Sequence, residues 1–151
     1  MTLAAMDLAF ANAELRQATP EHEVLVASPA VIVILKMVSY CDRPSERERD
    51  LEDITHLLDA YVDEDCERRW EDAAECEFDL APAFLLGLDV GHKLTAPTHH
   101  TVIDSFLERI GNDDSPQHAL MSRRGPKHWQ SESHALSRRL EAFRAGLAAA
   151  T

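Results

Sequence analysis

The chain has 151 residues, of which 45% are hydrophobic and 28% are charged, and its formal net charge is −12. This length fits a single domain that buries about two thirds of the surface of its unfolded chain. No apolar run approaches the roughly 18–20 residues of a membrane span, and three cysteines without a CxxC pair favour reduced thiols in the cytoplasm over a disulfide framework.

The first thirty residues predict one helix and one strand. Residues 2–15 have a dense apolar face, which is typical of a helix. In residues 23–28, Val24 and Val26 alternate with other side chains, which predicts a strand. Because one strand cannot form a sheet alone, we expect this segment to pair with another chain or with a strand that the pattern hides.

Two helices should follow as a hairpin. Ser28 before Pro29 has the form of an N-cap followed by proline at the first helical position, and it predicts a helix that runs to about Cys41. Ser45 and Glu48 then have the spacing of a capping box, which predicts that the next helix starts near residue 46.

The remaining segments predict mostly helices. We expect helices over residues 63–77, 79–94 and 97–111, a loop over 112–130, and a last helix from about residue 131. The expected fold class is therefore mainly α: a helical bundle of about six helices with one short β-strand, in a single helical domain of residues 1–151.

Charge is distributed unevenly along the chain. Residues 1–114 hold 9 Lys and Arg against 25 Asp and Glu, whereas residues 115–151 hold 6 against 2. The acidic body argues against a broad nucleic-acid surface, because phosphate contacts need clustered cations. The basic tail could contact RNA or tRNA, with Trp129 stacking on a base. The favoured alternative is that the tail lies against the acidic body and Trp129 seals a loop.

One lysine, Lys36, interrupts the most apolar segment of the chain, residues 30–38. Asp50 and Asp53 lie three residues apart in the next helix and share one face, which an antiparallel hairpin brings close to Lys36. The favoured interpretation is a structural Lys–Asp clamp, because a buried lysine needs a carboxylate partner. The alternative is a cation aimed at a nucleotide phosphate and oriented by the two aspartates.

These residues also carry a resemblance to a known family. The stretch VASPAVIVILKMVSYCDRP…RERDLEDITHLLDAY resembles nucleotidyltransferases of the AbiEii/AbiGii toxin type, in which a Ser/Pro-capped apolar helix with a lysine precedes an R/K-D-x-x-D-L-like helix. The matching residues are Lys36, Arg49, Asp50, Asp53 and Leu57. The resemblance covers about residues 1–95 and leaves 96–151 as C-terminal helices and the basic tail.

The resemblance implies a site for a nucleoside triphosphate on the lysine helix. Lys36 and Arg49 would bind the nucleotide, and the catalytic residues would be Lys36, Asp50 and Asp53. Activity would require Mg²⁺, because two divalent ions stabilise the in-line attack on the α-phosphate in such enzymes.

The chain departs from the family in the half that carries the metal ions. The family uses a G-S turn and strand-borne carboxylates, but none of the five glycines here belongs to a G-S or G-G pair. The only D-x-D, Asp63-Glu64-Asp65, is expected to be a solvated helix start. The resemblance therefore implies the C-terminal helical half of a nucleotidyltransferase-like α+β fold, without identifiable metal ligands and inactive alone.

A non-catalytic helical module for protein interaction or dimerisation is the alternative function. It would present residues 23–28 as a strand edge to a partner chain or to a symmetry mate. The surroundings of Lys36 separate the two functions, since a transferase needs an open cationic site there and a module leaves Lys36 in the clamp.

The histidines offer a weaker candidate site. His92, His99 and His100 lie near Asp89 in the sequence and could bind a metal ion together. No zinc-type spacing supports this, so scattered surface histidines are the favoured interpretation.

Overall fold

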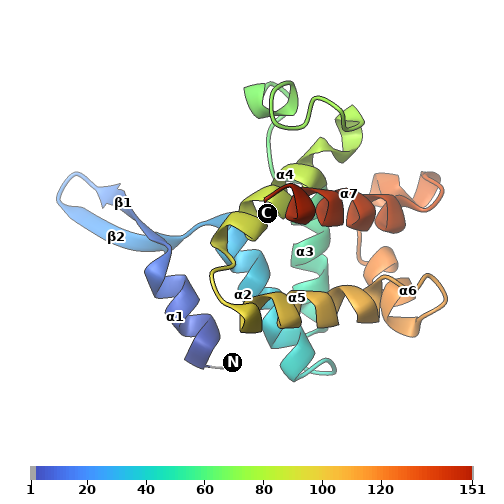
Figure 1. Ribbon diagram of the computed structural model, residues 1–151, viewed down its shortest axis with the longest axis horizontal. Coiled ribbons are helices and arrows are strands. Elements are labelled where there is room, and N and C mark those ends of the chain that lie inside the picture. The colour runs from blue at the N-terminus through green and yellow to red at the C-terminus, as the bar shows by residue number, and fades with distance from the viewer. Residues whose placement is uncertain (1–2, 151) are drawn as a thin grey trace.

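The computed structural model describes residues 3–150, with side chains from residue 6 onward. This part of the chain forms a mainly helical fold with one two-stranded antiparallel sheet, as expected (Figure 1). The α-helices are α1 Leu3–Ala11, α2 Pro29–Asp42, α3 Glu48–Ala60, α4 Ala81–Lys93, α5 Pro97–Ile110, α6 Pro116–Arg123 and α7 Ala135–Ala149. Short 3₁₀ turns occur at Glu67–Arg69, Phe78–Leu80 and Lys127–Ser131. None of the described helices combines the length and apolar character needed to cross a bilayer.

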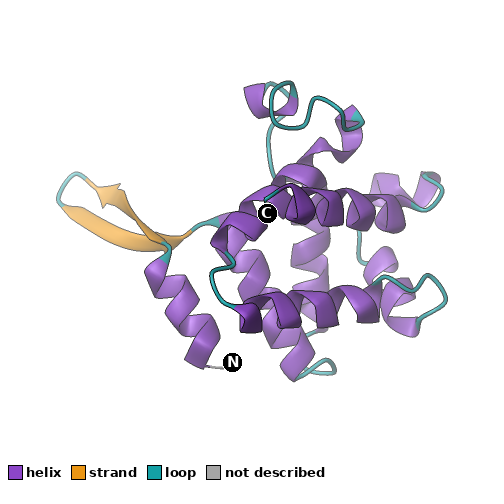
Figure 2. Ribbon diagram, in the orientation of Figure 1, coloured by secondary structure: helices purple, strands orange, loops and turns teal. Residues whose placement is uncertain are grey.

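The N-terminal segment differs from the sequence prediction. The helix predicted over residues 2–15 ends at Ala11, and Ala13–Thr19 forms strand β1, which pairs antiparallel with β2, His22–Ala27 (Figure 2). The expected strand thus finds its partner in its own chain, and the prediction of a single short strand is wrong. Helix-favouring residues in AELRQAT hid β1, because pairing with the valine-rich β2 overrides their local preference.

Helix α2 begins as its sequence predicts. The Ser28 side chain accepts the N–H of Val31 at 3.5 Å, and Pro29 occupies the first helical position, where no intrahelical donor is needed. The helix ends at Asp42, shortly before Pro44, which disfavours helix in the residue before it.

Helix α3 begins two residues later than predicted. Arg47 is its N-cap and makes no side-chain capping bond, so the capping box predicted for Ser45 and Glu48 is wrong. The carboxylate of Glu48 instead accepts a hydrogen bond from Arg124 at 3.0 Å. A tertiary ion pair has therefore replaced the local cap.

The segment between α3 and α4 is an irregular loop rather than the helix predicted over residues 63–77. The guanidinium of Arg69 is 7% exposed and donates to the main-chain carbonyls of Val62, Asp63 and Phe78 at 2.8–2.9 Å. These bonds satisfy carbonyls that a regular helix would have paired with its own N–H groups. One buried arginine therefore closes the loop.

Helices α4 and α7 cross at the centre of the molecule through two glycines. A β-carbon on Gly87 would lie 2.0 Å from the carbonyl oxygen of Phe143, and one on Gly146 would lie 2.0 Å from that of Phe84. Only glycine permits two backbones to approach this closely. The two glycines therefore set the distance between the central helices.

The predicted loop over residues 112–130 contains helix α6. Ser115 caps it by accepting the N–H of His118 at 3.0 Å, and Pro116 takes the first helical position. This is the same Ser-Pro signal that starts α2, and the sequence prediction treated it as a break. Helix α7 begins just after His134, whose backbone is left-handed with φ of 55°.

The hydrophobic core lies where α2, α3, α4, α5 and α7 meet. Its largest apolar or aromatic side chains with less than 2% exposure are Tyr40, Phe106, Phe143, Ile34, Met37, Leu51, Ile54, Leu58, Leu85, Leu86 and Ile103. Among the described side chains before Ala30, only Leu8 joins this core. We therefore divide the described chain into an arm, residues 3–27, and a body, residues 28–150.

Candidate functional site

Lys36 lies on α2 and faces the first turns of α3. Its ammonium donates to Oδ2 of Asp53 at 2.5 Å and to Oδ1 of Asp50 at 3.3 Å. The second oxygen of Asp50 accepts a bond from Nε of Arg47 at 2.8 Å. The side chains of Lys36 and Asp50 are 23% and 6% exposed. The Lys–Asp clamp predicted from the spacing is thus confirmed.

The clamp leaves little positive charge for a phosphate. Two cations, Lys36 and Arg47, face the carboxylates of Asp50 and Asp53, so the cluster carries no net formal charge. Arg49 is exposed and makes no hydrogen bond or ion pair with any described residue. Five cavities open on the described chain, and Lys36 does not line any of these five. The fold therefore brings three of the four predicted site residues together and leaves Arg49 apart.

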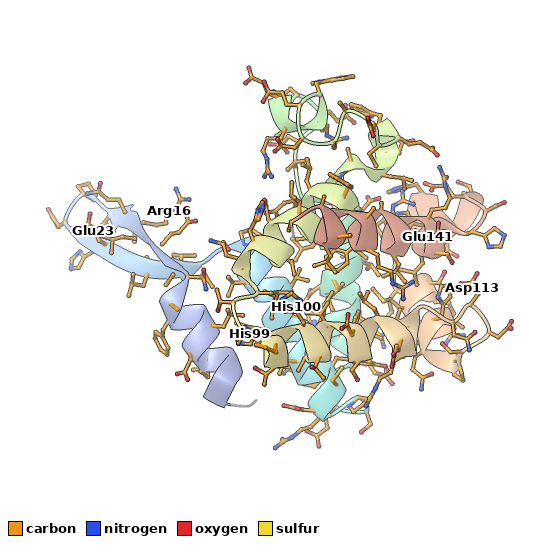
Figure 3. All side chains as sticks on the ribbon, viewed as in Figure 1. Arg16, Glu23, His99, His100, Asp113 and Glu141 are labelled. Carbon is orange, nitrogen blue, oxygen red and sulfur yellow. The ribbon has the colours of Figure 1, made fainter. Side chains whose placement is uncertain are left out.

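Metal-type ligands do not converge in residues 3–150. No group of three or more His, Cys, Asp or Glu side chains in this range is placed to hold a metal ion. Asp63-Glu64-Asp65 is exposed in the irregular loop rather than at a helix start. Figure 3 shows His99 and His100 in the first turns of α5, and Asp89 on α4 is occupied by other partners.

Asp89 joins the end of α3, the irregular loop and α4. Both of its oxygens accept bonds from Arg68 at 2.8 Å, and Oδ2 also accepts the hydroxyl of Tyr61 at 2.6 Å. Burial alone would raise the pKa of Asp89, but the bonds from Arg68 and Tyr61 outweigh it and hold that pKa below its ordinary value. Burial, reinforced by the bond to Asp89, raises the pKa of Tyr61. These hydrogen bonds hold the end of α3 and the irregular loop against α4.

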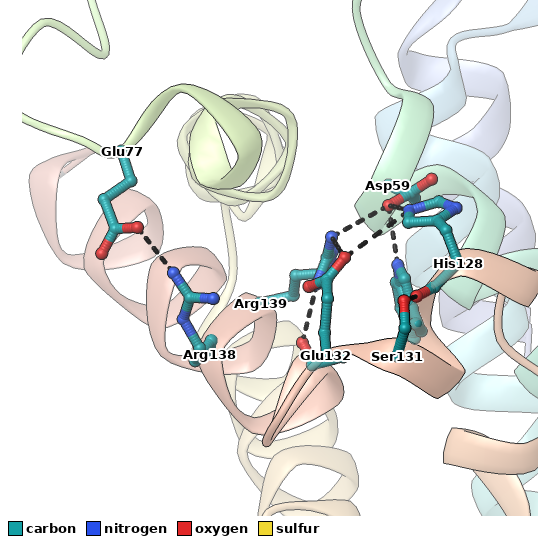
Figure 4. A network of polar contacts seen from close by, with 9 residues as sticks. Asp59, Glu77, His128, Ser131, Glu132, Arg138 and Arg139 are labelled. Atoms are coloured by element: carbon teal, nitrogen blue, oxygen red, sulfur yellow. Dashed lines mark hydrogen bonds and ion pairs between the residues drawn. The ribbon is translucent and has the colours of Figure 1, made fainter.

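The basic tail, residues 115–151, lies against acidic side chains of the chain before it, as the favoured interpretation predicted. Arg138 donates to Glu77 at 2.6 Å, and Arg139 donates to Glu132, which is itself in the tail, at 2.8 Å. Figure 4 shows both pairs. Arg139 also lies 3.2 Å from the carboxylate of Asp59. These pairs use cations that the RNA alternative would have directed at phosphates.

Trp129 packs inside the protein and seals a loop, so its ring is not accessible to a nucleic-acid base. The indole is 3% exposed, donates its N–H to Asp59 at 2.7 Å, and is covered by the guanidinium of Arg139 at 4.6 Å from the ring centre. The favoured interpretation that Trp129 seals a loop is therefore confirmed, and the alternative in which it stacks on an RNA base is wrong. Its apolar ring and polar N–H are both satisfied inside the protein.

The arm carries an apolar surface that sequence reasoning missed. In Figure 1 the hairpin projects beyond the helices of the body, and Figure 3 shows Arg16 and Glu23 on this projecting part. Eight large apolar side chains are exposed among the described residues, and six of them belong to the arm. These six are Met6, Phe10, Leu15, Val24, Leu25 and Val26. The other two pack on each other in the irregular loop of the body.

Helix α1 is apolar on every side. Asp7 is the only charged residue in its sequence LAAMDLAFA. Leu8 packs into the core with 3% exposure, whereas Phe10 is 69% exposed and Met6 is 37% exposed. A helix that is hydrophobic all round is normally covered all round. One face of α1 therefore meets the body and the described opposite face has no cover within the chain.

The hairpin has two faces and two open edges. One face pairs Leu15 with Leu25, which are 58% and 65% exposed. The other face sets Arg16 opposite Val24 and Glu14 opposite Val26. A single two-stranded hairpin is marginally stable in water, and unpaired edges are sites for strand addition. The alternation in 13–19 and the Pro20-Glu21 turn were the signals that could have found β1.

Comparison of the chain with known protein families, with curated proteins and with solved structures finds no match. The nucleotidyltransferase resemblance therefore rests on Lys36, Arg49, Asp50, Asp53 and Leu57 with the sequence around them.

Proposed function

We propose that this chain is a non-catalytic protein-interaction module that assembles with another polypeptide through its N-terminal arm. The observation that carries the proposal is the placement of six of the eight exposed large apolar side chains on the arm, among the described residues. Leu15 and Leu25 are cross-strand neighbours on one face of the hairpin, and contiguous exposed apolar surface of this kind marks interaction sites.

The arm offers two kinds of contact to such a partner. The unpaired edges of β1 and β2 supply main-chain donors and acceptors for an added strand, which gives affinity that does not depend on sequence. The exposed side chains of Leu15, Leu25 and Phe10 supply apolar surface. Burying such surface against a partner stabilises the complex by about 25 cal/mol per Å². Both contacts lie away from the core, so docking requires no rearrangement of the body.

The state of Lys36 supports a module over a nucleotide enzyme. Asp50 and Asp53 hold its ammonium, and a phosphate would have to displace two carboxylates to bind it. The nucleotidyltransferase function implied by the resemblance stays a prediction. It would need NTP at Lys36 and Arg49, and Mg²⁺ ligands from residues outside this site.

Native mass spectrometry of the tagged chain, isolated under mild conditions from its own cells, tests the proposal. We expect the wild type to retain a stoichiometric polypeptide, either its own copy or another protein, and Leu25→Lys to lose it. Leu25 is 65% exposed, so the substitution should leave the fold intact.

Trp70→Lys is the matched control, because Trp70 is 67% exposed but lies in the body. It should behave as the wild type does. Equal retention by all three proteins, or no stoichiometric partner in any of them, would refute the arm as a docking element.

A further inference from the structure

We infer that the arm docks onto a second copy of this chain, through the open edge of β1, to form a two-fold symmetric four-stranded antiparallel sheet. The inference rests on the proposed function and adds the identity of the partner and the register of the contact. It is carried by the charges of β1, whose sequence is AELRQAT.

Charge complementarity supports self-pairing of β1. When two copies of β1 run antiparallel and are centred on Leu15, Glu14 of each copy stands opposite Arg16 of the other. Both side chains are on one face, with 47% of Glu14 and 68% of Arg16 exposed, and within one chain they pair with each other at 2.5 Å. An exposed pair of this kind contributes little, so exchanging it for the same pair across the dimer costs little. Unlike charges directly opposite on neighbouring strands stabilise the pair. Two-fold symmetry produces this contact twice.

The same charges select one register. Centring the pair on Glu14 would place two glutamates opposite each other, and centring it on Arg16 would place two arginines opposite each other. Like charges in directly opposite positions are destabilising. A pairing register shifted by one residue would place Leu15 of one copy opposite Glu14 or Arg16 of the other, so the leucine face of one strand would join the charged face of its neighbour. Among the registers that set a charged residue of β1 opposite a charged residue of the other copy, only the one centred on Leu15 pairs unlike charges.

The resulting sheet also covers apolar surface. Leu15 and Leu25 are paired within one hairpin, so the dimer aligns four leucines across four strands on one face. In one chain these side chains are 58% and 65% exposed. Three or more strands with a hydrophobic face are needed for a stable sheet, and a lone hairpin falls short of that number.

The edge of β2 is a poorer candidate for self-pairing. Its sequence HEVLVA has one acidic residue, Glu23, and no lysine or arginine. Antiparallel pairing centred on Leu25 would set Glu23 opposite Ala27, with no unlike charge pair to fix the register. The prediction from sequence that residues 23–28 would pair with a symmetry mate is therefore replaced by pairing through β1.

The net negative charge of the chain bears on where two copies can meet. Each copy carries a formal net charge of −12, so two bodies repel each other at close range. The hairpin projects from the body in Figure 1, and its base lies next to the body, where Glu14 shares a cavity with Asp89 and His92. At about 0.1 M salt, charges separated by more than about 10 Å are largely screened.

Sedimentation equilibrium of two single charge variants tests the inference. In Arg16→Glu two glutamates would stand opposite each other across the dimer, and in Glu14→Arg two arginines would do so. Each variant alone should dimerise roughly tenfold more weakly than the wild type, because two unlike pairs become two like pairs. An equimolar mixture of the two variants should recover dimers, because every opposite pair is then unlike again.

Two body variants make the same charge changes at exposed residues that form no hydrogen bond or ion pair with described residues. Glu75→Arg matches Glu14→Arg, and Arg123→Glu matches Arg16→Glu. Both should dimerise as the wild type does, and their mixture should show no gain. At concentrations where the wild type is monomeric, thermal unfolding of all four variants should match that of the wild type, since every changed side chain is exposed and an exposed ion pair contributes little.

The outcomes separate this inference from the proposed function. A purified wild type that remains monomeric, or single variants that dimerise normally, or a mixture that fails to recover dimers, would overturn pairing through β1. The docking role of the arm would still stand in each case if Leu25→Lys, and not Trp70→Lys, loses the polypeptide retained from cells. Dimer formation by the equimolar mixture, together with weak dimerisation of each variant by itself, would establish the register.

Discussion

The ammonium of Lys36 holds two carboxylates of α3 against α2, and one of them, Asp50, is nearly buried. In Lys36→Ala, Asp50 would keep Arg47 as its only charged partner. We expect the free energy of unfolding in urea to fall by about 2 kcal/mol, because a bond to a charged group is lost at a shielded site. Asp53→Asn should cost less than about 1 kcal/mol, since that carboxylate is 46% exposed.

Nucleotide calorimetry on the same variant decides between the two roles of Lys36. Titration with ATP, GTP, CTP and UTP in the presence of Mg²⁺ should give no binding by the wild type or by Lys36→Ala. Binding by the wild type that disappears in Lys36→Ala would contradict the proposed function and favour the nucleotidyltransferase.

Asp89 makes stability depend on pH at the acid end. Its pKa is lowered in the folded protein, so its contribution is complete above the unfolded pKa of about 3.9 and is lost as pH falls through the folded value. Asp89→Asn should therefore be less stable than the wild type at neutral pH. The difference should shrink as urea unfolding is repeated down to about pH 3.

The control for this pH series is Asp104→Asn, which changes an exposed carboxylate on α5 that makes no hydrogen bond or ion pair with described residues. Its stability should follow the wild type at every pH. A constant difference between Asp89→Asn and the wild type across the series would rule out titration of Asp89 as the cause.

At the scale of elements, the crossing of α4 and α7 depends on the absence of a side chain at Gly146. Helix propensity alone would make Gly146→Ala stabilising by about 1 kcal/mol. We expect the opposite sign, a loss of about 1–3 kcal/mol, because the new methyl group would meet the carbonyl oxygen of Phe84. Urea unfolding measures the sign.

Ala145→Gly is the neighbouring control, at an exposed position of the same helix. It should cost about 1 kcal/mol through helix propensity only. Stabilisation by Gly146→Ala would mean that the two helices can move apart without penalty.

Strand β1 and helix α2 show why some elements can be predicted and others cannot. Helix α2 has a local start signal in Ser28 and Pro29 and a local stop near Pro44, so its bounds follow from short-range chemistry. The residues of β1 favour a helix locally, and only pairing with β2 makes them a strand. The loop closed by Arg69 has the same origin, because its three carbonyl partners span residues 62–78.

At the scale of the whole molecule, the basic C-terminal segment neutralises part of the acidic chain before it. Arg124, Arg138 and Arg139 all pair with carboxylates that lie more than 60 residues earlier in the sequence. The uneven charge along the sequence predicted this arrangement. These pairs join segments that lie far apart in the sequence.

The sequence by itself determined the mainly helical class, the Ser-Pro start of α2, the clamp of Lys36 with Asp50 and Asp53, and the contact between basic tail and acidic body. Each depends on helical periodicity, on capping chemistry or on opposite charges, which act locally or without precise geometry. Only the tertiary structure decided that residues 13–19 are a strand, that Arg69 and the paired glycines shape the body, and that the arm is uncovered. Those features depend on which distant segments meet, and exposure in particular is known only when every possible cover has been placed.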